Sequence, residues 1–131
     1  MADAIPSRIA VLLVEDDPLQ LMAAAAILRE AGCEVAEATT VEAAQVHLAA
    51  RPDLVAMVAD VDLAGDTLTG FTLAKAVAAR WPEIAILIAS GLVWPTDGDM
   101  PHGAHFLRKP FKEDGLVRAL RSVLAARGVG A

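Results

Sequence analysis

Short apolar runs alternate with longer segments of helical periodicity along most of this chain. Runs rich in valine, isoleucine and leucine predict strands, and uninterrupted runs predict strands that are covered on both faces. The candidate strands are Ile9–Val14, Glu34–Glu37, Leu54–Ala59, Ile84–Ala89 and His105–Leu107. Strands that alternate with helices are typical of an α/β fold with a parallel sheet and helices on both of its faces.

Two of the predicted helices carry recognisable start signals. The first has Asp17 as a candidate N-cap and Pro18 in its first turn, and Gly32 ends it. The second opens with Thr39-Thr40-Val41-Glu42, an order that fits a capping box. Two further helices are predicted at about residues 70–80 and 112–127.

The segment between Ser90 and Phe106 interrupts the alternation. It holds three glycines and two prolines and has no amphipathic period. We therefore expect a short or irregular element where the alternation requires a helix. Without any repeat or linker, residues 1–131 are expected to form one domain, with a core over about residues 8–127 and no output domain.

Composition narrows the classes of function. The chain has 131 residues, 56% of them hydrophobic and only 4% aromatic, with a formal net charge of −6. Nucleic-acid binding normally needs a basic surface and stacking rings, so the negative net charge and the low aromatic content argue against it. The single cysteine, Cys33, excludes an internal disulfide and a cysteine metal cluster. No apolar run reaches membrane-spanning length and no signal peptide is present, so we expect a soluble, cytoplasmic protein.

Charged and polar side chains directly follow four of the predicted strands. Glu15 and Asp16 follow the first strand, Asp60 the third, Ser90 the fourth and Lys109 the fifth. The carboxyl ends of parallel strands meet at one edge of a sheet, so these side chains are expected to lie close together. Carboxylate oxygens suit a hard cation such as Mg²⁺, and an amine and a hydroxyl suit phosphoryl oxygens.

Asp60 is the candidate nucleophile, because a carboxylate can accept a phosphoryl group to form an aspartyl phosphate. Asp62 and Asp66 compete for this role, but they lie further out in the turn after the strand. Ser90 and Lys109 are expected to contact the phosphoryl oxygens. Taken singly, each of these residues is equally consistent with a strand-end cap or a surface side chain, so the prediction depends on their joint placement.

In these motifs the chain resembles the receiver domain of bacterial two-component response regulators. The matching segments are Val11–Pro18, Asp60, Ser90-Gly91 and Phe106–Phe111. The resemblance implies a flavodoxin-like (CheY-like), doubly wound sheet of five parallel strands in the order 2-1-3-4-5. It also implies a phosphoprotein of phosphorelay signal transduction, in which Asp60 takes phosphate from a histidine kinase or a phosphotransfer protein.

The resemblance further implies a Mg²⁺ site and a role for each of its ligands. Asp16 and Asp60 would bind the ion directly, Glu15 through water, and Asp62 through its backbone carbonyl. No other cofactor is implied. Lys109 would contact the phosphoryl group, beside a cis bond to the proline that follows it.

A switch pair is implied as well. Ser90 would move toward the phosphoryl group, and the aromatic ring at Phe106 would change rotamer with it. Three features depart from the family pattern: the turn at residues 63–70 lacks the usual proline and is longer than common, the segment from Ser90 to Lys109 is short, and Gly91 replaces a common alanine. The helix expected in that short segment normally forms part of the face used for output and dimerisation in the family, so the sequence does not establish either role for this chain.

Three functions compete. The first is a phosphoacceptor that is no enzyme beyond its own phosphorylation and dephosphorylation, and that signals through a downstream protein or a phosphorelay. The second is a receiver-like module that binds proteins without phosphorylation. The third is a phosphatase, since Asp60-Val61-Asp62 is similar to the paired aspartates of haloacid dehalogenases. The sequence names neither the downstream target nor the oligomeric state.

Overall fold

The computed structural model describes residues 8–63, 69–96 and 98–128. Within these ranges five parallel strands form one sheet in the order β2-β1-β3-β4-β5. The strands are β1 (Ala10–Val14), β2 (Glu34–Ala38), β3 (Leu54–Asp60), β4 (Ala85–Ser90) and β5 (His105–Arg108). The predicted strands and the flavodoxin-like strand order are therefore confirmed, with each strand end within one residue of its predicted position.

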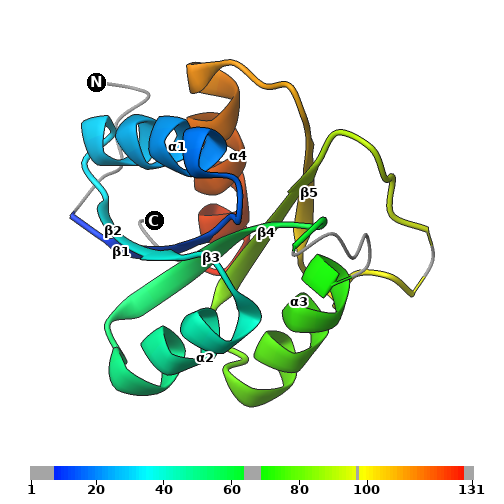
Figure 1. Ribbon diagram of the computed structural model, residues 1–131. Helices are drawn as coiled ribbons and strands as arrows, with labels where there is room; N and C mark the ends of the chain where they lie inside the picture. Colours follow the sequence, from blue (N-terminus) through cyan, green and yellow to red (C-terminus); the bar gives the residue numbers. More distant parts are fainter. Residues whose placement is uncertain (1–7, 64–68, 97, 129–131) are drawn as a thin grey trace.

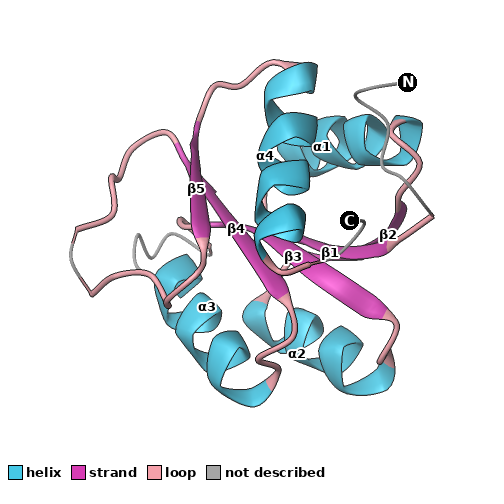
Figure 2. Cartoon of the chain, turned by 180° about the vertical axis from the view of Figure 1, so that it is seen from behind, coloured by secondary structure: helices cyan, strands magenta, loops and turns pink. Residues whose placement is uncertain are grey.

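Helices cover both faces of the sheet. They are α1 (Pro18–Glu30), α2 (Val41–Ala50), α3 (Thr69–Arg80) and α4 (Glu113–Ala126). Figure 1 shows α1 and α4 on one face and α2 and α3 on the other, and Figure 2 shows the same two layers from behind. Each layer encloses its own apolar core, and every residue of β1 and β4 is buried. No helix in the described ranges has the length and apolar character to cross a membrane.

Helix α1 starts where its cap signal predicts. Asp17 is the N-cap, and its Oδ1 accepts hydrogen bonds from the backbone N–H groups of Leu19 (2.9 Å) and Gln20 (3.3 Å). These bonds satisfy donors that have no partner inside the helix. Gly32 follows the helix with a φ of +103°, a conformation that glycine adopts at little cost. The cap fixes where the first turn of α1 lies relative to the end of β1.

Helix α2 corrects one prediction. Its N-cap is Thr40, whose hydroxyl accepts a hydrogen bond from the N–H of Ala43 at 3.0 Å. The third residue after this cap is alanine, which has no side-chain oxygen to bond back to Thr40. The predicted capping box is therefore wrong, although the helix begins in the predicted place.

Between β4 and β5, the described residues 91–96 and 98–104 form turns and contain no helix. Val93 and Met100 pack against the core beneath α3. The Trp94 ring lies 5.4 Å from the Phe106 ring, and the guanidinium of Arg108 lies 4.6 Å from the centre of Trp94. The predicted irregular element is confirmed for the described residues, and its Trp94 contacts β5.

Candidate functional site

Strand register brings the predicted site residues to one edge of the sheet. β1 and β3 run side by side with Val14 opposite Ala59, so the residues that follow, Glu15 and Asp60, are neighbours. Ser90 closes β4, and the backbone N–H of Lys109 donates to the Ser90 carbonyl at 2.9 Å. Ordinary parallel pairing therefore gathers the carboxylates, the hydroxyl and the amine at the carboxyl ends of four strands, as predicted.

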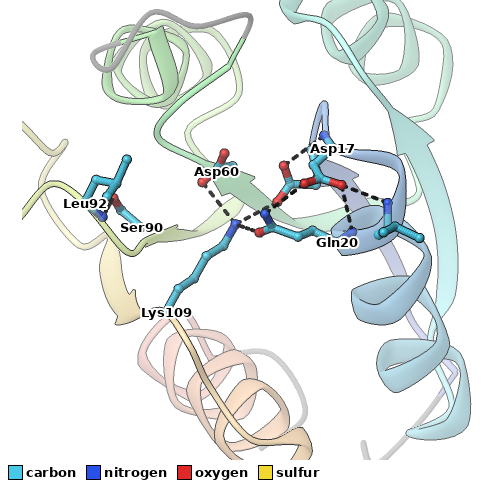
Figure 3. A network of polar contacts seen from close by, with 8 residues as sticks. Asp17, Gln20, Asp60, Ser90, Leu92 and Lys109 are labelled. Carbon is cyan, nitrogen blue, oxygen red and sulfur yellow. Dashed lines mark hydrogen bonds and ion pairs between the residues drawn. The ribbon is translucent and has the colours of Figure 1, made fainter.

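Lys109 makes the central polar contacts of this edge. Its Nζ donates to Glu15 Oε1 at 2.7 Å, to Gln20 Oε1 at 2.5 Å and to Asp60 Oδ1 at 3.2 Å. The lysine side chain is 19% exposed, while those of Glu15 and Asp60 are 6% and 11% exposed. Figure 3 shows the Lys109 side chain reaching from the end of β5 to a point between Asp60 and Gln20. Ion pairs with this little exposure are only weakly screened by water and salt.

Gln20 is the member of this network that sequence reasoning missed. Its Oε1 accepts from Lys109, and its Nε2 donates to Asp17 Oδ2 at 3.2 Å. Gln20 stands three residues after the N-cap Asp17, the position at which a glutamine or glutamate side chain commonly folds back on the cap. That spacing was the available signal, although nothing local predicts the contact with a lysine 89 residues further along the chain.

The charges of the site shift one another's pKa. Burial raises the pKa of Asp60 to about 6; the charge of Lys109 opposes this rise, and repulsion from Glu15 adds to it. For Lys109, burial alone would lower the pKa, but the hydrogen bonds and charges of Glu15 and Asp60 outweigh burial and raise it. A buried carboxylate that is this hard to ionise is typical of functional sites.

The donor set fits a hard divalent cation. One carboxylate oxygen from each of Glu15, Asp16 and Asp60 lies within 4.8 Å of the others. Asp62 Oδ1 is buried and has no hydrogen-bond partner within the described part of the chain. Mg²⁺ prefers carboxylate and carbonyl oxygens together with water, and its charge would offset the mutual repulsion of these acids. The spacing of the three carboxylates therefore agrees with the predicted metal site, and the unpaired oxygen of Asp62 is a further acceptor in the same cavity.

The two aspartates that compete with Asp60 differ in what the structure shows of them. Asp62 lines the same cavity as Asp60 but follows β3 by two residues and is not among the hydrogen-bond acceptors of Lys109. Asp66, like the long turn that contains it, lies outside the described residues. Of the carboxylates that follow β3 in the described chain, only Asp60 is bonded to Lys109, which keeps it the candidate nucleophile.

The predicted switch pair is present but occupied by local contacts. Ser90 is 3% exposed, and its hydroxyl accepts hydrogen bonds from the N–H groups of Leu92 (3.3 Å) and Val93 (3.0 Å). The Ser90 hydroxyl therefore caps the turn that follows β4, which is the purely structural role that the sequence also allows. Phe106 is half-buried and packs against Trp94. The peptide bond from Lys109 to the following proline is cis, as the resemblance implies.

A cavity of about 590 Å³ opens over this edge. Glu15, Asp60, Asp62, Ser90 and Lys109 form its polar part, and its apolar part includes Ala23, Ile27, Leu92, Pro110 and Phe111. The acids and the lysine are thus reachable from outside through a mouth with apolar walls. This geometry suits an anionic group presented by a larger molecule that has an apolar surface.

Comparison with known proteins defines the class. The model of the response regulator receiver domain matches residues 11–121, and the chain belongs to this family. It is 31% identical over 127 residues to the nitrogen assimilation regulatory protein NtrX of Azorhizobium caulinodans. The alignment covers 91% of this chain and 28% of that protein, so the chain spans about a quarter of the curated relative's length.

Solved receiver structures agree with this assignment. The chemotaxis response regulator CheY4 of Vibrio cholerae is 27% identical, with a TM-score of 0.76 over 90% of this chain and 100% of that one. A response regulator receiver protein from Sinorhizobium medicae is 24% identical, with a TM-score of 0.79 over 92% and 97%. The second likeness bears on the fold alone. Receiver domains generally bind Mg²⁺ in an acidic pocket, where this chain has Glu15, Asp16 and Asp60.

Proposed function

We propose that this receiver domain accepts a phosphoryl group on Asp60 in a Mg²⁺-dependent transfer from the phosphohistidine of a histidine kinase or a phosphotransfer protein. The observation that carries the proposal is the contact at 3.2 Å between Lys109 Nζ and Asp60 Oδ1, inside an acidic, accessible cavity. This contact pairs the candidate nucleophile Asp60 with the ammonium of Lys109, whose positive charge would stabilise the incoming phosphoryl group.

The transfer exchanges a phosphorus–nitrogen bond for a phosphorus–oxygen bond. A carboxylate oxygen of Asp60 forms a bond to phosphorus while the phosphorus–nitrogen bond of the donor breaks. The electron pair of that bond returns to the imidazole, which leaves as a neutral ring if its other nitrogen carries a proton. Phosphoryl transfer depends mainly on alignment and on charge stabilisation, so the residues around Asp60 do most of the catalytic work.

Three roles follow for the residues around Asp60. Lys109 donates to a phosphoryl oxygen, and Ser90 donates its hydroxyl proton to another when it leaves its contacts in the turn. Asp16 and Asp60 would hold the cation directly, Glu15 would act through water, and Asp62 would offer its backbone carbonyl. When bound, Mg²⁺ supplies positive charge to the transferring group and lowers the repulsion between the acids.

A protein donor fits the mouth of the cavity better than a small solute does. Leu92 lines the mouth with 81% of its surface exposed, and Pro110 and Phe111 lie at the same cavity. Exposed apolar residues beside a charged site are typical of a surface that another protein covers. In this proposal the domain is cytoplasmic, is no enzyme beyond its own phosphorylation and dephosphorylation, and signals by binding a downstream protein or passing the phosphate on.

The phosphatase alternative is less well supported. In haloacid dehalogenases the paired aspartates usually follow the first strand, whereas Asp60 and Asp62 follow β3. Family membership also favours the phosphoacceptor role over the phosphatase role. A receiver that binds proteins without phosphorylation remains the alternative outcome of the experiment below.

Intact-mass spectrometry after incubation with acetyl phosphate tests the proposal. We expect one phosphoryl group on the wild type with Mg²⁺, none with a chelator, and none on Asp60→Asn. Asp114→Asn is the matched control, because it makes the same exchange at an exposed aspartate of α4 outside this cavity and should still be labelled. Labelling of Asp60→Asn would contradict the assignment of the acceptor. If neither acetyl phosphate nor a phosphorylated histidine phosphotransfer domain labels the wild type, the phosphorylation-independent role is favoured.

A further inference from the structure

The ammonium of Lys109 has no spare donor. A lysine ammonium carries three N–H groups, and the three acceptors of Lys109 are Glu15 Oε1, Gln20 Oε1 and Asp60 Oδ1. Two of these acceptors are carboxylates of the acidic cluster, and the third is a neutral amide from the first turn of α1. Gln20 thus accepts a hydrogen bond from the ammonium as the two acids do, although the proposed function gives Gln20 no role.

Gln20 is itself held in place by a closed ring of hydrogen bonds. Its Nε2 donates to Asp17 Oδ2, and the Asp17 N–H donates to Glu15 Oε2 at 3.2 Å. Glu15 Oε1 and Gln20 Oε1 then both accept from Lys109. The ring also fixes the orientation of the amide, since a flipped amide would turn its NH₂ group toward the ammonium.

We infer that Gln20 is a positioning residue, which holds the Lys109 ammonium over Asp60 for phosphoryl transfer. The inference rests on the proposed function and adds a member to its site. Lysine side chains have many rotamers. An ammonium bound only by the carboxylates of Glu15 and Asp60 could move with either of these two side chains. The neutral third acceptor, anchored through Asp17 to the capped start of α1, restricts Lys109 to one place.

The arrangement also indicates which bond changes during transfer. When a carboxylate oxygen of Asp60 bonds to phosphorus, Asp60 loses its charge and becomes a weaker acceptor. The contact from Lys109 to Asp60 is the longest of the three, and its N–H is the one that turns to a phosphoryl oxygen. The bonds to Glu15 and Gln20 remain, so the ammonium keeps its position before and after the transfer.

A purely structural role for Gln20 predicts something different. Gln20 contacts the N-cap Asp17, and it could serve only to stabilise the start of α1. Two variants separate these roles. Gln20→Met has a similar length but removes both the acceptor and the donor. Gln20→Glu keeps an acceptor for Lys109, while it loses the donor to Asp17 and places a second carboxylate beside the Asp17 carboxylate. Gln45→Met makes the same exchange at an exposed site of α2 and serves as the matched control.

The experiment measures the initial rate of phosphoryl uptake from acetyl phosphate at saturating Mg²⁺, together with the melting temperature of each variant. Loss of a positioning contact should slow Gln20→Met by about tenfold, while Gln20→Glu recovers most of the rate and Gln45→Met matches the wild type. Equal rates for Gln20→Met and the wild type would overturn the inference. So would equally slow Gln20→Met and Gln20→Glu, since only the cap contact is lost in both.

A second readout does not depend on phosphorylation. Nitrogen-15 NMR can detect a lysine ammonium that is held by hydrogen bonds and protected from exchange with water. We expect a Lys109 ammonium signal in the wild type and in Gln20→Glu, and its loss in Gln20→Met; an unchanged signal in Gln20→Met would overturn the inference. If the wild type takes up no phosphoryl group from acetyl phosphate or from a phosphorylated histidine phosphotransfer domain, the proposed function fails, and this signal alone still decides whether Gln20 holds Lys109.

Discussion

The acidic edge of the sheet and the segment between β4 and β5 are built in opposite ways. At the acidic edge, Lys109 joins Glu15, Gln20 and Asp60 through directional bonds, and each partner follows a buried strand or starts a capped helix. The segment after Ser90 has no helix in its described residues, and the exposed ring of Trp94 contacts Phe106 and Arg108 of β5.

This difference shows where the precision of the molecule is concentrated. Side chains at the ends of regular elements inherit the positional accuracy of the sheet, and phosphoryl transfer requires that accuracy. A turn-rich segment held by ring contacts can change its conformation at lower cost, because few buried groups depend on it. The chain therefore combines an acidic site held by directional bonds with a neighbouring segment held mainly by ring and apolar contacts.

The largest expected effect concerns the backbone beneath Asp60. Gly70 lies in the first turn of α3, and its N–H donates to the Val61 carbonyl at 2.8 Å. A Cβ at this position would overlap the carbonyl oxygen of Asp60 and the Cα of Val61, which are backbone atoms that cannot rotate away. We expect Gly70→Ala to lower the free energy of unfolding in urea by at least about 3 kcal/mol.

Gly115→Ala is the control for this prediction. Gly115 lies in α4, and a Cβ there would meet only the Cβ of Phe111 at 3.8 Å, an ordinary van der Waals distance. Alanine in a helix should raise the free energy of unfolding by about 0.5–1 kcal/mol. If the two variants have equal stability, the close packing of α3 on Asp60 does not position the acceptor.

The second effect concerns the charge of Asp60. Its pKa lies near 6 in the folded protein, above the ordinary value of 3.8, so between these pH values the folded chain holds a proton that the unfolded chain has released. Stability due to this group is complete below pH 4 and is lost as the pH rises through 6. The free energy of unfolding of Asp60→Asn, relative to that of the wild type, should therefore rise by on the order of 2 kcal/mol between pH 4 and pH 7.

Urea unfolding of both proteins in chelator at each pH measures this gain. Adding Mg²⁺ at pH 7 should stabilise the wild type and reduce the gain, because the ion binds only the folded state. A constant difference between the two proteins from pH 4 to pH 7 would contradict a raised pKa. In that case, ionisation of Asp60 would not destabilise the folded chain.

Most of the fold was predictable from the sequence for a physical reason. Buried parallel strands are short apolar runs, so their ends were placed within one residue. Because these ends also carry Glu15, Asp60, Ser90 and Lys109, the residues of the site could be predicted with them. The strand order came from the family resemblance, since periodicity does not say which strands are neighbours.

The features that the sequence did not predict are long-range contacts, or they depend on which of two adjacent residues the structure uses. The contact from Lys109 to Gln20 joins residues 89 positions apart, and a neutral glutamine carries no charge pattern that predicts it. The packing of Trp94 on Phe106 likewise depends on how an irregular segment turns back. For α2, two adjacent threonines were available as caps, and the structure uses Thr40. Such choices depend on the packed structure and not on local propensity.

The smallest effect concerns the segment between β4 and β5. Trp94 is 58% exposed, packs against Phe106 and lies under the guanidinium of Arg108. Because ring contacts and exposed cation–π pairs are each worth about 0.5–1 kcal/mol, we expect Trp94→Leu to lower the free energy of unfolding by about 1 kcal/mol. The loss should be well below that of Gly70→Ala, and urea unfolding measures both.

A double-mutant cycle with Arg108→Met isolates the part due to the cation. If Arg108 acts through the Trp94 ring, its substitution costs about 0.5 kcal/mol in the wild type and almost nothing in Trp94→Leu. Additive losses would mean that the two side chains do not stabilise each other. Arg108 would then add nothing to the packing of Trp94 on Phe106 and of Val93 and Met100 on the core, and the contrast with the acidic edge would be one of burial, not of bond type.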